Sequence, residues 1–262
     1  MKTLLATQEL HLRMQERVLV HSLDLNVRAG EVWAVIGPNG AGKSTLLRTL
    51  AGLRDVDGGE VSLDGKPLSR YSPKTLARRR GFLPQAVTDA FSLTVRDAVA
   101  SARYPHLSFW HWGDEDDEPT REALATFELD ALADRDITTL SGGERQRVNI
   151  AAIFAQDVDV LLLDEPLSSL DLHQQMRVLQ ELERTAVRDE RAVIYSVHDI
   201  NLAIRHATHA ILLDGNGTAL AGPMLDVVTG DNLSAAFRHP IHGVDIDGER
   251  FFRAGRLTNP KP

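Results

Sequence analysis

Two short stretches of the sequence have the residue types that bind phosphate. The first, GPNGAGKST at residues 37–45, places glycines where backbone N–H groups can converge on phosphate oxygens. Lys43 can reach the β and γ phosphates of a nucleotide, and the Ser44 hydroxyl can ligate Mg²⁺. The loop therefore predicts a site for a nucleoside triphosphate and its magnesium ion. The residues expected to contact the nucleotide are Asn39, Gly40, Gly42, Lys43, Ser44 and Thr45.

The second stretch, LSGGERQRV at residues 140–148, is a serine and two glycines that lead into a charged segment of helical character. Ser141, Gly142 and Gly143 could cradle an anion at the start of that helix, where backbone N–H groups are free. The chain thus carries two phosphate-binding elements about a hundred residues apart. These residues alone leave open which phosphate the second one binds.

Polar side chains follow two apolar strands. VLLLDEP, at residues 160–166, brings Asp164 to the end of a buried strand, where it can hold Mg²⁺ through water. Glu165 beside it can orient or deprotonate an attacking water. His198 follows AVIYSV in the same way and could bond both a γ-phosphate and that carboxylate. Gln85, in GFLPQ, could touch the metal or the water, although Gln85 and His198 taken alone could each be purely structural.

Strands and helices alternate around these residues. The apolar runs LVHSLDLNV and EVWAVIG predict strands, the second ending in the glycine loop, and STLLRTLAGL has helical spacing. After Gln85 the strand pattern fades, and TVRDAVASAR and TREALATFELDALA predict amphipathic helices around the polar loop GDEDDEP. From Leu140 strands and helices alternate again, and ILLDGNGTALAG predicts a hairpin. We expect an α/β fold with a helical insertion.

Composition limits the class of protein. With 262 residues, 43% of them hydrophobic and 25% charged, the chain suits one large α/β domain or a core with an insertion. The absence of cysteine excludes disulfides and thiolate chemistry. No apolar run reaches the roughly 18 residues of a membrane span, so we expect a cytoplasmic protein. The net charge of -8 argues against a nucleic-acid partner.

The ordered motifs resemble those of the nucleotide-binding subunits of ABC transporters. GPNGAGKST, LPQ, LSGGERQRV, LLLDEP, SSLD and VHD follow the order of that family's Walker A, Q-loop, signature, Walker B, D-loop and switch-histidine motifs, over nearly the whole chain. The resemblance implies a P-loop NTPase core of ABC type, a parallel sheet with an antiparallel N-terminal β part. The single domain 1–262 would comprise a nucleotide-binding core at 1–85 and 140–240, a helical subdomain at 86–139 and a C-terminal extension at 241–262.

The resemblance also assigns the second cradle. In this family the signature closes over ATP held by the Walker A loop of the opposite subunit, so Ser141, Gly142 and Gly143 would serve the partner's nucleotide in a homodimer. Asp171, in SSLD, would lie near the dimer axis and could also cap the following helix. The resemblance implies ATP and Mg²⁺ as cofactors. The implied catalytic residues are Glu165, His198 and Gln85, and the implied metal contacts are Ser44, Gln85 and Asp164.

Less specific motifs indicate which class of ABC transporter the chain resembles. ARYPHL, VHDINLAIRHATHAILL and AGPMLDVVTGDNL look like the ATPases of importers for metal chelates: cobalamin, ferric siderophores and haem. IRHATHAILLDGNGTALAG and VDIDGERFF look most like the vitamin B12 importer's ATPase. This implies a homodimer on two membrane-spanning permease subunits, served by a substrate-binding protein, at the cytoplasmic face of the inner membrane.

Two other functions remain open from the sequence. An ABC exporter ATPase differs chiefly in weak motifs such as ARYPHL. A soluble ABC protein of DNA repair or translation usually needs a coiled coil or second nucleotide domain and basic surfaces. One departure concerns the base: the family usually stacks adenine on an N-terminal aromatic residue, and HLRMQERV contains none. We expect Leu12 or His11 to replace it, with loose base selectivity.

Overall fold

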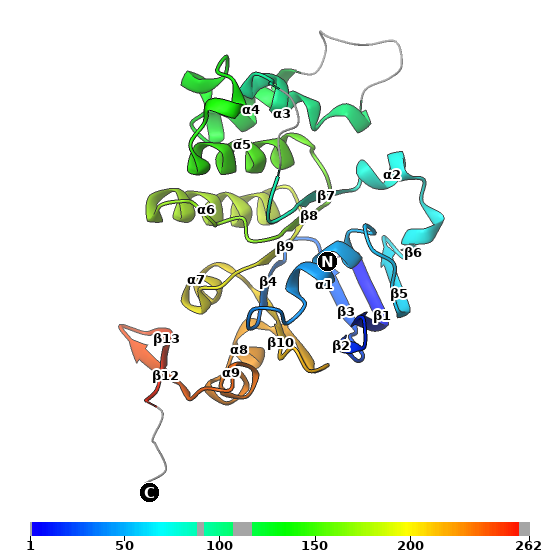
Figure 1. Cartoon of the computed structure of the whole chain (residues 1–262), viewed down its shortest axis with the longest axis vertical. Coiled ribbons are helices and arrows are strands. Elements are labelled where there is room, and N and C mark those ends of the chain that lie inside the picture. The colour runs from blue at the N-terminus through cyan, green and yellow to red at the C-terminus, as the bar shows by residue number, and fades with distance from the viewer. Residues whose placement is uncertain (1, 88–91, 107–116, 257–262) are drawn as a thin grey trace, which may run out of the picture.

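The structure, a computed structural model, describes residues 2–87, 92–106 and 117–256. Part of the polar loop GDEDDEP and the C-terminal residues TNPKP lie outside the described residues. Figure 1 shows the helices α3 (Val95–Ser101), α4 (Asp117–Thr126) and α5 (Gly142–Ala155) together at one end of the molecule. The strands β12 (Ile241–Ile246) and β13 (Glu249–Ala254) lie near the other end.

A central six-stranded sheet has the order β11-β10-β4-β9-β8-β7, and all its neighbouring pairs are parallel except β10 with β11. Its strands are β4 (Val32–Ile36), β7 (Arg80–Leu83), β8 (Val160–Leu163), β9 (Ala192–Ser196), β10 (His209–Leu213) and β11 (Ala219–Pro223). β4, β8 and β9 are buried along their whole length, as expected for a parallel sheet covered on both faces. Their carboxyl ends share one edge, which brings the segments after them together.

The N-terminal strands form a second, antiparallel sheet. They are β1 (Thr3–Met14), β2 (Arg17–Val20), β3 (Leu25–Arg28), β5 (Gly58–Leu63) and β6 (Lys66–Pro67). Leu46, Leu47 and Leu50 of α1 (Lys43–Leu50) pack in one core with this sheet and with one face of the central sheet. On the other face, α6 (Leu172–Arg188) and α7 (Ile200–His206) pack in a second core. The predicted α/β fold with an antiparallel N-terminal part is confirmed.

Two expected elements are wrong in extent. LVHSLDLNV was expected as one strand, but β2 ends at Val20 and β3 begins at Leu25, because each pairs with a different part of the long strand β1. TREALATFELDALA was expected as one helix, but α4 ends at Thr126 and Glu128 has a positive φ of 54°. Arg177 donates to the Thr126 carbonyl, and Arg147 donates to the carbonyls of Phe127 and Glu128 just after the helix.

The helices α3, α4 and α5 pack against one another. The expected helix TVRDAVASAR is confirmed as α3, whose first turn is capped by the Thr94 side chain. The division into 1–85 and 140–240, 86–139 and 241–262 stays a prediction. The short elements are η1 (Leu68–Arg70), α2 (Pro73–Ala77), η2 (Tyr104–His106), η3 (Asp130–Leu132), η4 (Ile137–Thr139), α8 (Met224–Val227) and α9 (Gly230–Phe237).

The C-terminal strands β12 and β13 pair with each other and dock on α7. Asn201 Oδ1 accepts a hydrogen bond from the Phe252 N–H at 2.8 Å, and Asn201 Nδ2 donates to the Phe252 carbonyl at 3.2 Å. The hairpin expected in ILLDGNGTALAG is confirmed as β10 and β11. Within the described ranges, no helix is both long and apolar enough to span a membrane.

Candidate functional site

The glycine loop between β4 and α1 depends on backbone conformations that favour glycine. Gly40 and Gly42 have φ values of 73° and 105°, in the left-handed region. A Cβ atom at Gly42 would also lie 3.2 Å from the Leu19 side chain. The loop therefore turns directly into the start of α1, where backbone N–H groups are free to bind an anion.

Lys43 is buried at the start of α1, with 6% of its surface exposed. Its Nζ donates to the carbonyls of Gly37 at 2.9 Å and Pro38 at 3.3 Å, which holds the ammonium under the loop. Burial lowers the pKa of Lys43, and the carboxylates of Glu165 and Asp164 oppose that shift. A bound triphosphate would add negative charge beside this desolvated ammonium and so favour its charged form.

One pocket gathers most of the predicted site residues. Its lining includes Met14 and Leu19, together with Lys43 and Thr45 of α1. The predicted residues that line it are Asn39, Gly40, Gly42, Lys43, Ser44, Thr45, Gln85, Glu165 and His198. These residues come from the segments that follow β4, β7, β8 and β9, including the first turn of α1, so the edge of the central sheet assembles the site.

Glu165 is held between two polar side chains in this pocket. Gln85 Nε2 donates to Glu165 Oε2 at 3.0 Å, and His198 Nε2 lies 2.8 Å from Glu165 Oε1. Glu165 has a φ of 52°, an uncommon conformation for a residue with a side chain. Three sequence segments thus fix one carboxylate in the phosphate pocket. Such a group can take a proton from a water that attacks phosphorus.

Asp164 precedes Glu165 in the chain and is fully buried. Its Oδ1 accepts a hydrogen bond from Ser196 Oγ at 2.8 Å, while Oδ2 has no hydrogen-bond partner among the described residues. A buried carboxylate oxygen without a donor is costly unless a cation or water satisfies it. Asp164 does not itself line the pocket, but Ser44 and the next residue, Glu165, do. A carboxylate oxygen and a hydroxyl are ligands that a hard cation such as Mg²⁺ binds. The residues present therefore fit the expected metal.

The second cradle lies on a separate surface. Ser141, Gly143 and Asp171 line a pocket with Ser169, and a Cβ atom at Gly142 would also face Ser169. Ser141 caps α5, and its hydroxyl donates to Glu144 Oε2 at 2.7 Å. Asp171 caps α6 by accepting the Gln174 N–H at 2.9 Å, so the expected capping role of Asp171 is confirmed. The signature residues do not line the Lys43 pocket of their own chain.

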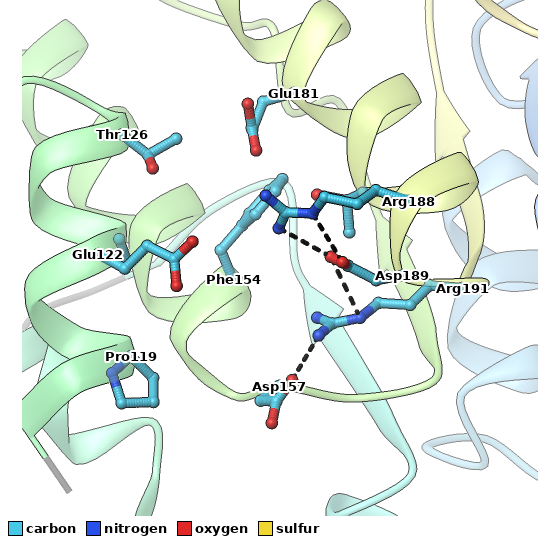
Figure 2. A pocket seen from close by; sticks show the side chains of 11 residues that line it. Pro119, Glu122, Thr126, Phe154, Asp157, Glu181, Arg188, Asp189 and Arg191 are labelled. Carbon is cyan, nitrogen blue, oxygen red and sulfur yellow. Dashed lines mark hydrogen bonds and ion pairs between the residues drawn. The ribbon is translucent and has the colours of Figure 1, made fainter.

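Another charged cavity lies between the helices α4 and α5 and the end of α6 (Figure 2). Its arginines are paired with carboxylates: Arg188 Nε lies 2.7 Å from Asp189 Oδ1, and Arg191 pairs with Asp157. Burial raises the pKa of Glu181, which lines the same cavity. Asp157 and Arg191 precede β8 and β9, so this cavity lies at the opposite end of these strands from Asp164 and His198. It is separate from the phosphate pocket.

The residues expected to stack on the base do not line the phosphate pocket. Leu12 is fully buried in the core, and His11 packs against His21 with ring centroids 5.5 Å apart. Met14, 56% exposed, and Leu19 line the phosphate pocket instead. Leu10 and Leu12 point into the core, and the pairing of β1 with β2 shifts register after Leu12, which leaves Met14 exposed at the end of the strand.

Sequence reasoning also missed Ser196. Its hydroxyl contacts both Asp164 and the backbone of Glu165. A signal was present, since Ser196 is a polar residue inside the apolar run AVIYSV, two positions before His198.

Fold and site together define a P-loop nucleoside triphosphatase whose strand ends carry the phosphate loop, an acidic pair and a histidine. The chain matches the family model described as ABC transporter over residues 20–168. It belongs to the ABC transporter family, as an ATP-binding subunit that hydrolyses ATP to drive transport.

Relatives and solved structures agree with this assignment. The chain is 44% identical to the hemin import ATP-binding protein HmuV of Nocardia farcinica, over 83% of this chain and 75% of that protein. It is 37% identical to the probable siderophore transport system ATP-binding protein YusV of Bacillus subtilis, over 87% of this chain and 83% of that protein. A metal-chelate type ABC transporter solved in an inward-facing conformation matches with a TM-score of 0.84 and 29% identity, over 98% of this chain and 99% of that one.

Proposed function

We propose that two copies of this chain energise the import of a metal chelate by closing head to tail over ATP. The observation that carries the proposal is the separation of the two cradles. Lys43 and Glu165 share one pocket, whereas Ser141, Gly143 and Asp171 line another. A two-fold pair would bring the pocket of each copy against the signature surface of its partner and so complete two equivalent sites.

In each site Glu165 is the general base. Its carboxylate takes the proton of a water that attacks the γ-phosphorus; the bond to the β–γ bridging oxygen breaks, and ADP and phosphate leave. Gln85 and His198 hold the two carboxylate oxygens at 3.0 and 2.8 Å and so aim the base. Lys43 neutralises charge on the β and γ phosphates.

Ser44, Asp164 and Gln85 are the residues that would hold Mg²⁺. When bound, the ion neutralises charge on the phosphate oxygens. Asp164 is suited to this task because it is fully buried and one of its oxygens has no protein donor among the described residues. Gln85 bonds Glu165 in this structure, so its contact with a metal would require that amide to turn.

ATP bound between the two copies would stabilise the closed dimer, because its γ-phosphate would contact the phosphate pocket of one copy and the signature surface of the other. The Ser141 hydroxyl donates to Glu144 in this structure, so an incoming phosphate competes with that carboxylate for the hydroxyl. Hydrolysis removes the γ-phosphate contacts, and the pair opens. Asp171, at the start of α6 beside Ser169, would lie near the dimer axis.

The cargo proposed is a metal chelate, and the relatives' names indicate which ones to test. Proteins named for hemin, siderophore, iron(3+)-hydroxamate and ferric enterobactin transport are 37% to 44% identical to this chain. The sequence favours cobalamin within the same group. The homodimer would bind two membrane-spanning subunits at the cytoplasmic face of the inner membrane, and a substrate-binding protein would deliver the chelate.

Uptake tests this proposal. Cells without this chain are supplied with labelled haem, ferric siderophore or cobalamin, after complementation with the natural chain or with Glu165→Gln. We expect the uptake of one chelate to be lost and then restored by the natural chain alone. Unchanged uptake of all three, with recovery of the chain on ribosomes or DNA instead of integral membrane subunits, would refute an import role.

A further inference from the structure

We propose that Ser196 is a positioning residue for ATP hydrolysis. Its hydroxyl fixes the metal carboxylate of Asp164 and the backbone of Glu165 relative to each other. The inference rests on the proposed site, because it concerns how this chain aligns Asp164 and Glu165. Ser196 itself would not touch ATP or the ion.

The Ser196 hydroxyl makes two bonds that no other described side chain duplicates. Oγ donates to Asp164 Oδ1 at 2.8 Å and accepts the Glu165 N–H at 2.7 Å. Ser196 and Asp164 are both fully buried, so water does not replace either bond. One hydroxyl therefore links two consecutive residues that have different expected tasks.

The position of Ser196 in the sheet explains why a side chain is needed here. β8 and β9 are parallel and in register from Val160 with Ala192 to Leu163 with Tyr195. At the next residues β8 ends, and Glu165 turns into the left-handed region with φ 52°. The backbone ladder therefore cannot hold the Glu165 N–H, and the Ser196 hydroxyl bonds it instead.

The hydrogen bond from Ser196 to Asp164 fixes the orientation of the Asp164 carboxylate. By holding Oδ1, Ser196 sets the rotation of the carboxylate and leaves Oδ2 without a protein donor among the described residues. Oδ2 is the oxygen that we expect to face the metal and its water. Without the hydroxyl, Asp164 could turn toward the Lys43 ammonium, which already interacts with its charge. The metal site and the base would then lose their common alignment.

The test compares Ser196→Ala with Ser196→Thr, which keeps the hydroxyl. For Ser196→Ala we expect kcat for ATP to fall about tenfold or more, with KM changed by less than about threefold, because two buried bonds near the reacting atoms are lost. A second readout does not depend on turnover. In a Glu165→Gln background, the factor by which Mg²⁺ strengthens ATP binding over EDTA should shrink at least about threefold, while affinity in EDTA stays unchanged. Ser196→Thr should restore both values.

Ser234→Ala is the matched control. The Ser234 hydroxyl also bridges two elements, accepting the Ile241 N–H at 2.8 Å and donating to the Gly230 carbonyl at 2.6 Å, but it lies in α9 and not in the phosphate pocket. We expect it to lower the melting temperature and leave kcat and the Mg²⁺ effect unchanged. If Ser196→Thr has a lower melting temperature than Ser196→Ala, because its methyl group does not fit, Ser196→Cys replaces Ser196→Thr in the test. The kcat and the Mg²⁺ effect of Ser196→Cys should then lie between those of the natural chain and those of Ser196→Ala.

Folded Ser196→Ala with the natural kcat and the natural Mg²⁺ effect would overturn the proposal. So would a folded hydroxyl-bearing variant that is no faster than Ser196→Ala. Failure of the proposed function is distinguishable, because then the natural chain would not hydrolyse ATP or Glu165→Gln would hydrolyse it normally.

Discussion

Replacing Glu165 with glutamine should stop turnover and leave the fold and ATP binding almost intact. Glutamine has the same shape, and its amide oxygen can still accept from Gln85 Nε2, now 3.0 Å from the carboxylate. Its amide nitrogen would then face His198 Nε2, 2.8 Å away, which can accept as a neutral imidazole. The loss in stability should be about 1 kcal/mol or less, the difference between a charge-assisted and a neutral bond.

The effect on turnover should be far larger. General base catalysis contributes roughly a hundredfold to ten-thousandfold, so phosphate release should fall at least about a hundredfold, or ~2.7 kcal/mol. With hydrolysis blocked, Mg-ATP should hold the variant as a dimer, measured by light scattering.

Glu183→Gln is the control for this substitution. Glu183 also bonds a histidine, with His206 Nδ1 at 2.6 Å from its Oε1, but it lies on α6 and does not line the phosphate pocket. It should hydrolyse ATP at the natural rate. Phosphate release by Glu165→Gln within threefold of the natural chain, or a Glu165→Gln that stays monomeric in Mg-ATP, would refute the reasoning.

The remaining predictions concern nucleotide binding and the cavity that Glu181 lines. Lys43→Ala should weaken ATP binding roughly tenfold to a hundredfold, because charge-assisted contacts to the phosphates are lost; calorimetry checks this. Met14→Tyr should strengthen ATP binding several-fold, because an aromatic ring stacks on a base better than the exposed thioether of Met14. The affinities of the natural chain for ATP and GTP should differ by less than about tenfold in a competition titration. Burial raises the pKa of Glu181, so the native state gains stability from protonating it, and this gain is lost as the pH rises through the folded pKa. Glu181→Gln should therefore melt higher than the natural chain at pH 8, and that advantage should disappear below the carboxyl's ordinary pKa of about 4.3.

The nucleotide pocket could be predicted because its residues sit at strand ends. Asp164 and His198 end apolar runs, and parallel strands bring their carboxyl ends to one edge, so order along the chain implies proximity. Glu165 and Gln85 follow from the same rule, whereas Lys43 was predicted from the glycine-loop motif that follows β4.

Features set by tertiary contacts were not predictable. The end of α4 at Thr126 depends on Arg177, which lies on α6 far along the chain and has no periodic signature. Met14 lines the phosphate pocket and His11 does not, because the pairing of β1 with its neighbours is irregular and shifts which residues face the pocket. The role of Ser196 depends on the register of β8 against β9, which sequence spacing does not give.

The central claim is that each ATP site joins Lys43 of one copy to Ser141 of the other, and mixing two inactive variants tests it directly. Lys43→Ala and Ser141→Arg are each expected to lack ATPase activity. In a mixed dimer, one site would combine the natural Lys43 with the natural Ser141, and the other site would carry both defects. Random pairing of equal amounts makes half the dimers mixed, so the mixture should recover about a quarter of the natural rate of phosphate release. A mixture as inactive as the two variants alone would contradict the claim, because sites built within one chain cannot complement each other.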